Sequence, residues 1–197
     1  MCGIVGYIGN EQAAPILLDG LSKLEYRGYD SAGLAIRNGE NITEIVKAKG
    51  RLKNLEEKTD NGHALKGDCG IGHTRWATHG EPSETNAHPH CTDDMNVVAV
   101  HNGIIENYEE LKDHFGLADE LISDTDSEVV AAVLNRFYTG DPHEALFQTV
   151  KCLKGTFALV VIFDDIPDVI FAIRNVSPIV AAYREDGTML ASDVAAL

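Results

Sequence analysis

The sequence feature that most constrains the fold is an Asn-Gly dipeptide between two runs of strand-forming residues. The runs cover residues 31–37 and 42–48, and Asn38-Gly39 lies between them. Asn-Gly favours the two-residue turn of a β-hairpin, because both central positions of that turn need a positive φ. Part of the chain is therefore predicted to form an antiparallel sheet.

Strand patterns gather at both ends of the chain, and helix patterns with capping residues lie in the middle. No repeat or linker interrupts them, so residues 1–197 are predicted to form one domain. This order predicts an α+β fold in which helix layers pack over stacked antiparallel sheets. Besides the hairpin, strands are expected at 2–8, 70–74, 97–101, 156–163, 169–173, 179–183 and 188–191. Helices are expected around Leu17, Leu18, Leu21 and Leu24, and at 108–115 (with Asn107 and Glu110 in a capping arrangement), 127–138 and 142–153.

Composition limits the partners of this chain. Sixteen Lys and Arg residues stand against thirty-one Asp and Glu residues, a net charge of −15. This charge repels phosphate backbones and anionic lipid, and no apolar run approaches the ~20 residues of a membrane helix. Nucleic-acid and membrane partners are therefore not expected. Four cysteines without CxxC spacing, and a start without a signal-peptide pattern, predict free thiols in the cytoplasm.

Cys2 lies directly behind the initiator methionine and becomes the N-terminal residue if Met1 is removed. An α-amino group with a pKa of about 7.7–8.0 can then accept the proton of a thiol with a pKa of about 8.5. One residue would thus supply both the nucleophile and the base. The alternative is an inert cysteine at the start of a strand, which position alone favours.

A polar segment between residues 73 and 103 holds five of the eight histidines. One interpretation is a metal site, but the segment contains neither an HExxH motif nor paired CxxC or HxxxH ligands. No metal or other cofactor is therefore expected, and a structural metal or thiol protein ranks last. The residues of this alternative are His73, His79, His88, His90, His101 and Cys91.

Other residues carry chemistry suited to an amino-acid substrate. Arg75, at the end of a predicted strand, offers a planar guanidinium that matches a carboxylate, although such an arginine is usually a surface cation. Asn102-Gly103 is either a type I′ turn or a side-chain amide and a backbone N–H that hold an oxyanion. Asp126 is either an ordinary acidic residue in the first turn of a helix or a partner for a substrate ammonium.

Five segments in order resemble the class II glutamine amidotransferases, which use an N-terminal cysteine as nucleophile. They are CGIVGYIG at 2–9, LEYRGYDSAG at 24–33, GHTRWATHGEPSETNAHPH at 72–90, HNGIIENY at 101–108 and TDSE at 125–128. CGIVG alone is shared across the class. The second and third segments are specific, and they are most similar to the glutaminase domain of the glucosamine-6-phosphate synthase family.

The resemblance implies a four-layer αββα sandwich, the N-terminal nucleophile hydrolase fold. It also implies that Cys2 attacks the side-chain amide of glutamine, forms a thioester and releases glutamate and ammonia. The implied positions are Asn102 and Gly103 at the oxyanion, Arg75 at the α-carboxylate, Asp126 at the α-ammonium, and Trp76, Thr78, His79 and His88 around the pocket or its covering loop.

In whole enzymes of that family, the ammonia converts fructose 6-phosphate to glucosamine 6-phosphate, and the resemblance implies a homodimer. The chain is expected to be a C-terminally truncated glutaminase domain without the sugar isomerase domains. If Met1 is retained, a non-catalytic regulatory domain that binds glutamine or glutamate is the alternative. One departure is Val176, where the family usually has a small residue, often glycine.

Overall fold

Two antiparallel sheets form the centre of the protein. The computed structural model describes residues 2–38 and 43–197. The first sheet has the order β3 (Thr43–Lys49), β2 (Ser31–Arg37), β4 (Cys69–Arg75), β1 (Gly3–Gly9), β10 (Gly187–Ala191) and β9 (Val180–Arg184). The second has the order β5 (His90–Cys91), β6 (Val97–Ile105), β7 (Gly155–Phe163) and β8 (Phe171–Asn175).

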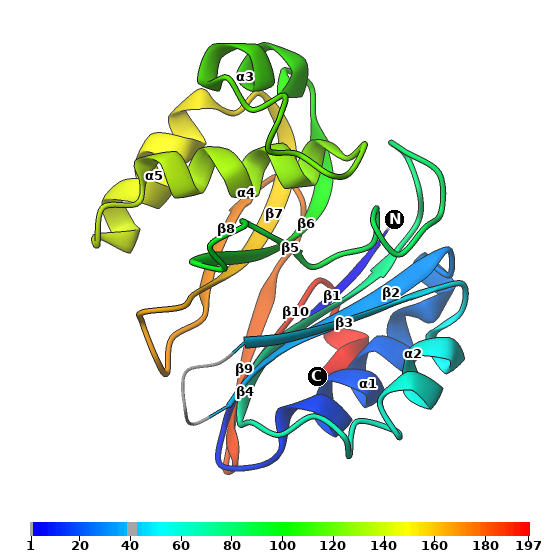
Figure 1. Cartoon of the computed structure of the whole chain (residues 1–197). Helices are drawn as coiled ribbons and strands as arrows, with labels where there is room; N and C mark the ends of the chain where they lie inside the picture. Colours follow the sequence, from blue (N-terminus) through cyan, green and yellow to red (C-terminus); the bar gives the residue numbers. More distant parts are fainter. Residues whose placement is uncertain (1, 39–42) are drawn as a thin grey trace.

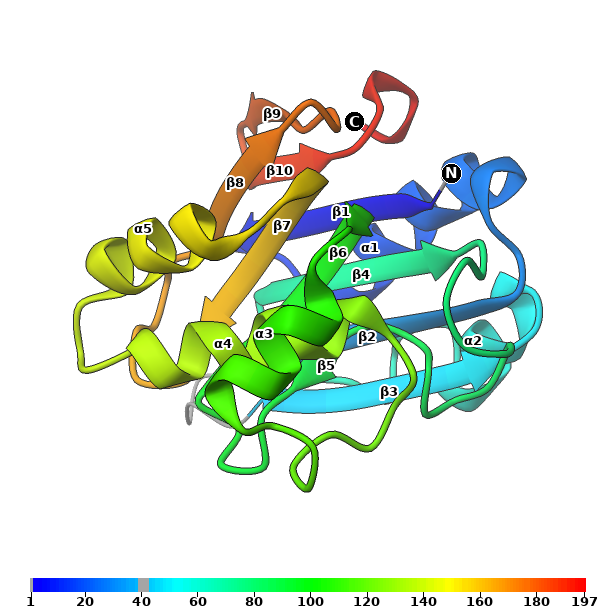
Figure 2. The same cartoon turned by 90° about the horizontal axis from the view of Figure 1, so that it is seen from above.

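Helices cover the outer face of each sheet. Figure 1 shows α1 (Ala13–Leu24) and α2 (Leu52–Lys58) below the first sheet, and α3 (Tyr108–Phe115), α4 (Asp126–Phe137) and α5 (Pro142–Cys152) above the second. Short 3₁₀-helices follow α1 and β10, as η1 (Glu25–Arg27) and η2 (Val194–Ala196). The view from above shows the strands of the two sheets crossing (Figure 2). The predicted αββα sandwich is confirmed, and no helix in the described ranges is long and apolar enough to cross a membrane.

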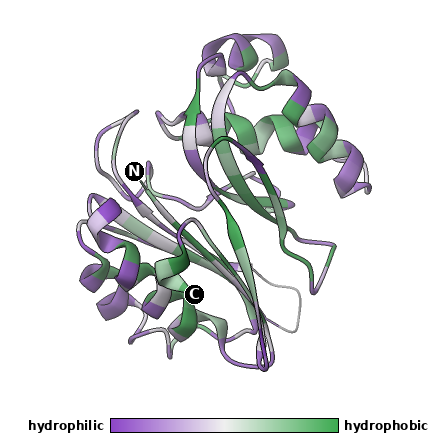
Figure 3. Ribbon diagram, turned by 180° about the vertical axis from the view of Figure 1, so that it is seen from behind, coloured by the Kyte–Doolittle hydropathy of each residue, from purple (hydrophilic) through white to green (hydrophobic). Residues whose placement is uncertain are grey.

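The apolar side chains form three clusters, one between each pair of neighbouring layers. Successive residues of a strand point to opposite faces of a sheet, so one strand serves two clusters. On β6, Val98 and Val100 face the other sheet, whereas Val97 and Ala99 pack toward the helices. The apolar strands between more polar helix surfaces are visible in Figure 3. Burial on both faces explains why these strands are almost continuously hydrophobic.

The same alternation carries polar residues into the layer between the sheets. On β4, His73 and Arg75 continue the row of Cys69 and Ile71, which face the second sheet. On β6, Asn102 continues the row of Val98 and Val100. At one end of the sandwich, the apolar layer therefore gives way to facing polar side chains from both sheets.

The sequence-based elements agree with the structure, with a few corrections. The predicted hairpin is present as the antiparallel pair β2 and β3, although Gly39 of its turn lies outside the described residues. Helix α2 was not predicted, because only Leu52 and Leu55 of its seven residues are buried and they form no long periodic pattern. The two-residue strand β5 was also missed, and β8 begins two residues later than expected.

The expected capping role of Asn107 is wrong. Asn107 stands at the N-cap of α3, but its side chain makes no capping hydrogen bond. Its Nδ2 donates to the carbonyl of Cys152 at 2.9 Å, and its Oδ1 accepts from Lys154 N at 2.8 Å. Asn107 therefore bonds to the end of α5 and not to the first turn of α3. The sequence pattern cannot reveal such a tertiary contact.

Val176 has a strained backbone, and we expect its replacement to stabilise the protein. Its φ is 72°, in the left-handed region that β-branched residues avoid, and its side chain is 73 % exposed. Such strain costs about 1–3 kcal/mol, whereas glycine costs about 0.5–1 kcal/mol in chain entropy. Val176→Gly should therefore raise the free energy of unfolding by about 1 kcal/mol, measured by urea denaturation.

The matched control is Val194→Gly. Val194 is similarly exposed at 69 %, but it lies in η2 and is absent from the described residues with positive φ. Its replacement removes no strain, so it should lower stability by about 0.5–1 kcal/mol. Destabilisation by both substitutions would show that the strain at Val176 is negligible.

Candidate active site

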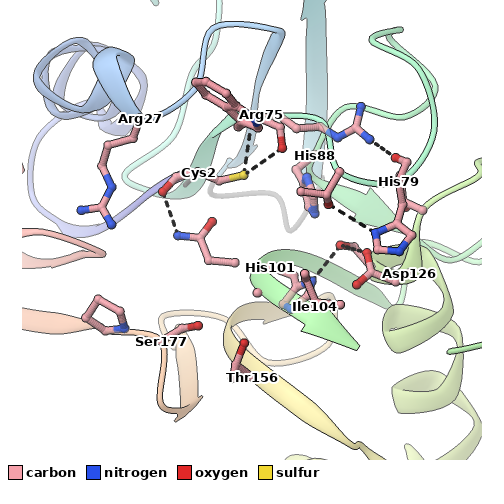
Figure 4. Close-up of a pocket in the computed structure, with 17 residues that line it drawn as sticks. Cys2, Arg27, Arg75, His79, His88, His101, Ile104, Asp126, Thr156 and Ser177 are labelled. Carbon is pink, nitrogen blue, oxygen red and sulfur yellow. Dashed lines mark hydrogen bonds between the residues drawn. The ribbon is translucent and has the colours of Figure 1, made fainter. Parts of the chain in front are cut away.

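A cavity of about 390 Å³ opens at the polar end of the layer between the sheets (Figure 4). Its walls come from the residue before β1 and from parts of β4, β6, β7 and α4, which are distributed along the sequence. All the residues that the resemblance assigns to a glutamine site line this one cavity. They are Cys2, Arg75, Trp76, Thr78, His79, His88, Asn102, Gly103 and Asp126.

The thiol of Cys2 lies against the backbone at the end of β4. Trp76 N donates a hydrogen bond to Cys2 Sγ at 3.2 Å, and Sγ lies 3.6 Å from the Trp76 carbonyl. Burial raises the pKa of the Cys2 thiol, and the Trp76 hydrogen bond and the charge of Arg75 offset this only in part. The thiol is therefore protonated at neutral pH, and a nucleophilic role requires a base close to it.

Asn102 and Gly103 lie within β6, so the type I′ turn considered for them is wrong. They pair with Ala158 and Phe157 of β7 in a ladder that continues to Ile105. Asn102 Nδ2 donates to the carbonyl oxygen of Cys2 at 3.1 Å. Gly103 has a φ of 134°, and a Cβ there would lie 1.9 Å from the Thr156 carbonyl. Only glycine fits at position 103, which keeps the strand next to the cavity free of a side chain.

Arg75 is the last residue of β4 and is almost completely buried. Its guanidinium donates to the carbonyls of His79, Gly80 and Glu81, which fixes the loop beside the cavity. Burial lowers the pKa of Arg75, while the nearby Cys2, Asp30 and Asp126 raise it. The arginine stays protonated, so a fixed positive charge lines the cavity.

Gly28 allows another segment to approach this arginine closely. It ends η1, and a Cβ at position 28 would lie 2.6 Å from the backbone carbon of Arg75. The backbone of residue 28 therefore packs directly on the end of β4. This contact gives a physical reason for the glycine in the YRGYD segment.

Asp126 begins α4 and is only 4 % exposed. Its Oδ2 accepts from Ile105 N at 2.9 Å, and its Oδ1 lies 3.3 Å from the Ser127 hydroxyl. Thr125, not Asp126, caps the helix, since its Oγ1 accepts from Glu128 N at 3.2 Å. Within residues 2–38 and 43–197, no Lys, Arg or His forms an ion pair with Asp126. A buried carboxylate without such a partner suits a cationic group of a ligand.

Two of the rings that line the cavity, those of Trp76 and His79, are in contact with tyrosines outside it. Trp76 is 45 % exposed, and its ring meets Tyr29 edge to face at a centroid distance of 5.6 Å. His79 makes a similar contact with Tyr108 at 5.5 Å, and its Nδ1 lies 3.3 Å from the Thr78 hydroxyl. These contacts hold the segment after β4 over the cavity.

Three buried histidine rings lie in contact, His73 tilted against His88 and His88 edge to face with His90. The rings of His73 and His88 are 4.0 Å apart, and those of His88 and His90 are 4.7 Å apart. Burial lowers the pKa of each, and that of His73 to about 3, so these imidazoles are neutral at pH 7. Among the described residues, no three His, Cys, Asp or Glu side chains are arranged to hold a metal ion.

Sequence reasoning missed several residues that line the same cavity. Arg27 comes from η1 and forms an ion pair with Asp193 at 2.7 Å. It lies inside the YRGYD segment, which was the one available signal. Ser177 and Pro178 come from the connection between β8 and β9, whose position depends on the packing of the sheets. His101, which the sequence offered only as a metal ligand, also lines the cavity, and the other missed residues are Ile104, Thr125, Ser127 and Thr156.

Comparison with known proteins places this fold in a class. Glutamine phosphoribosylpyrophosphate amidotransferase from B. subtilis superimposes with a TM-score of 0.85 at 23 % identity, over 99 % of this chain and 42 % of that one. The layered fold is that of the N-terminal nucleophile amidotransferases. A family model described as "Glutamine amidotransferase domain" matches residues 73–197. The chain belongs to this glutamine amidotransferase domain family.

Two curated relatives share one name. Proteins called glutamine–fructose-6-phosphate aminotransferase (isomerizing) are 52 % identical over 200 residues in Caldanaerobacter subterraneus subsp. tengcongensis and 48 % identical over 198 residues in Clostridium tetani. Each alignment covers 100 % of this chain and 32 % of the relative. The chain thus spans about a third of the length of these relatives.

Proposed function

We propose that this domain hydrolyses the side-chain amide of glutamine through a thioester on Cys2. The observation that carries the proposal is one cavity lined by a thiol, a side-chain amide, a buried guanidinium and a buried carboxylate. These groups are Cys2, Asn102, Arg75 and Asp126. They provide a nucleophile, an oxyanion donor and two opposite charges, which is what an amino acid with a carboxamide side chain requires.

The reaction needs the amino group of Cys2 to be free, because the raised pKa of the thiol requires a base. The amine takes the thiol proton while Sγ attacks the amide carbon, and the carbonyl oxygen becomes an oxyanion. Asn102 Nδ2 and Gly103 N–H stabilise that oxyanion. The C–N bond then breaks, the amine returns the proton to the departing nitrogen as ammonia, and water hydrolyses the thioester to glutamate.

Recognition of the substrate rests on the two buried charges. The planar guanidinium of Arg75 matches the α-carboxylate of glutamine, and the Asp126 carboxylate matches its α-ammonium. Both charges are already fixed by hydrogen bonds, Arg75 to the loop carbonyls and Asp126 to Ile105 N. Trp76, Thr78, His79 and His88 complete the wall and the covering segment.

The names of the relatives extend this proposal to a longer protein, of which this chain would be the glutaminase domain. In that protein, the ammonia would aminate fructose 6-phosphate to give glucosamine 6-phosphate, through domains outside this chain. This step rests on the 48–52 % identity to proteins named for that reaction. A homodimer of the longer protein belongs to the same proposal.

Labelling tests the glutaminase proposal. Protein whose intact mass shows the loss of Met1 is incubated with a diazo-ketone analogue of glutamine, and the adduct is mapped by mass spectrometry. One adduct on Cys2, prevented by excess glutamine, is the expected result. Modification at Cys69, Cys91 or Cys152 instead would contradict the proposal, because those thiols do not line the cavity.

A second function, binding of glutamine or glutamate without turnover, is favoured if Met1 is retained. The amine that accepts the Cys2 proton would then be part of a peptide bond and could not act as a base. Calorimetry combined with an ammonia assay separates the two functions. Binding without ammonia release would identify a regulatory domain, whereas turnover excludes it.

A further inference from the structure

His73 lies behind Asn102 in the layer between the sheets and has no role in the reaction described above. It is completely buried, and its Nε2 lies 3.1 Å from two atoms, the carbonyl oxygen of His101 and Asn102 Oδ1. The first of these partners is a backbone oxygen, which only accepts hydrogen bonds. Because the His101 carbonyl can only accept whereas the Asn102 amide can be oriented either way, the positions of the hydrogen atoms on His73 and Asn102 can be deduced.

The carbonyl of His101 decides which ring nitrogen of His73 carries the proton. A neutral imidazole has one N–H and one lone pair, and a lone pair on Nε2 would repel the carbonyl oxygen. The proton therefore resides on Nε2. Burial supports the neutral state, because it lowers the pKa of His73 to about 3.

The proton on Nε2 in turn decides the orientation of the Asn102 amide. An Nε2–H can be satisfied by Oδ1 of Asn102 but not by its NH2 group, so Oδ1 must face His73. The NH2 group then faces Cys2, where Nδ2 donates to the Cys2 carbonyl at 3.1 Å. An amide NH2 has two hydrogens, so one remains for an oxyanion in the cavity.

We propose that His73 is a positioning residue, whose Nε2–H locks the Asn102 amide with its NH2 group toward Cys2. The inference rests on the proposed function, because the locked NH2 group matters only if an oxyanion forms. His73 touches neither the substrate nor the reacting atoms. If the amide were rotated by half a turn, Oδ1 would face the Cys2 carbonyl, and two acceptors would repel each other and the oxyanion.

A double-mutant cycle on glutamine hydrolysis tests the inference. His73→Leu removes the donor and should lower kcat about 10- to 100-fold with little change in KM, because a misoriented oxyanion donor affects mainly the transition state. His73→Gln, whose amide N–H can replace Nε2–H, should restore most of kcat. In an Asn102→Ala background, His73→Leu should change kcat less than about twofold, because no amide remains to be oriented.

A purely structural role predicts a different pattern. His73→Leu would then lower kcat by the same factor with or without Asn102, and His73→Gln would not rescue it. Either result would overturn the inference. If wild-type protein without Met1 releases no ammonia, the proposed function fails, and the orientation of the amide is then judged by the measurement below.

A second measurement uses the unaltered protein, so it does not depend on whether the variants fold. ¹⁵N shifts of labelled histidine distinguish a protonated ring nitrogen from one with a lone pair. The expected spectrum shows His73 with the proton on Nε2 and the lone pair on Nδ1 between pH 6 and pH 8. A proton on Nδ1 would place a lone pair against the His101 carbonyl and would refute the proposed lock.

Discussion

Cys2→Ala should abolish the hydrolysis of glutamine, with a loss of at least about 10⁴-fold in kcat. Removal of a covalent nucleophile costs several orders of magnitude, because the remaining groups cannot form the acyl intermediate. The substitution removes only a sulfur atom that bonds weakly to the Trp76 backbone, so the thermal unfolding midpoint should change little. Ammonia release by protein without Met1 and a thermal melt provide the two measurements.

Cys91→Ala is the matched control for this prediction. Cys91 is half-buried like Cys2, but it does not line the cavity. Its replacement should leave kcat within about twofold of the wild-type value. Turnover retained by Cys2→Ala protein, with the substitution verified by mass, would show that Cys2 is not the nucleophile.

The second large effect is expected for Asp126→Asn. Asparagine has the same shape and can still accept from Ile105 N, so the fold should be preserved. The loss of the charge opposite the substrate ammonium should cost about 2–4 kcal/mol, which corresponds to a rise of about 30- to 1000-fold in KM for glutamine. Steady-state kinetics over a wide range of glutamine concentrations measures this rise.

Asp124→Asn and a truncated substrate are the controls. Asp124 lies two residues earlier, accepts from Asn86 Nδ2 at 3.3 Å and does not line the cavity, so its neutralisation should leave KM unchanged. Glutaramate, which is glutamine without its α-amino group, should be hydrolysed equally poorly by the wild-type and Asp126→Asn proteins. A large effect of Asp126→Asn on glutaramate would place Asp126 elsewhere in the reaction.

The layered fold and the candidate roles of Cys2, Arg75, Asn102-Gly103 and Asp126 follow from local sequence patterns, whereas Trp76, Thr78, His79 and His88 were implied only by the resemblance to the amidotransferases. Runs of apolar and β-branched residues define the strands, and Arg75 directly follows the run predicted as strand 70–74. Once β4 and β6 are recognised as facing strands, the alternation also predicts that His73 and Asn102 point toward each other. It does not predict whether the two residues lie at matching positions along their strands, because that depends on the angle at which the two sheets cross.

The rest of the site depends on tertiary packing. Arg27 lies in a short 3₁₀-helix and lines the cavity. It forms an ion pair with Asp193, which is 166 residues away in the sequence. Ser177 arrives from a connection between strands of different sheets. No periodicity or spacing encodes such contacts, just as none encodes the bonds of Asn107 to the end of α5.

The proposed nucleophile and its amide partner are held by different sheets, because Cys2 directly precedes β1 and Asn102 lies within β6. The distance between Cys2 and Asn102 therefore depends on the thickness of the apolar layer between the sheets, to which side chains such as Ile71 and Val100 contribute. Because protein interiors are closely packed and deform little, this apolar layer keeps the two sheets at a fixed distance. Adding or removing one methylene in that layer would change the distance from Cys2 Sγ to Asn102, although no atom of the layer contacts the substrate.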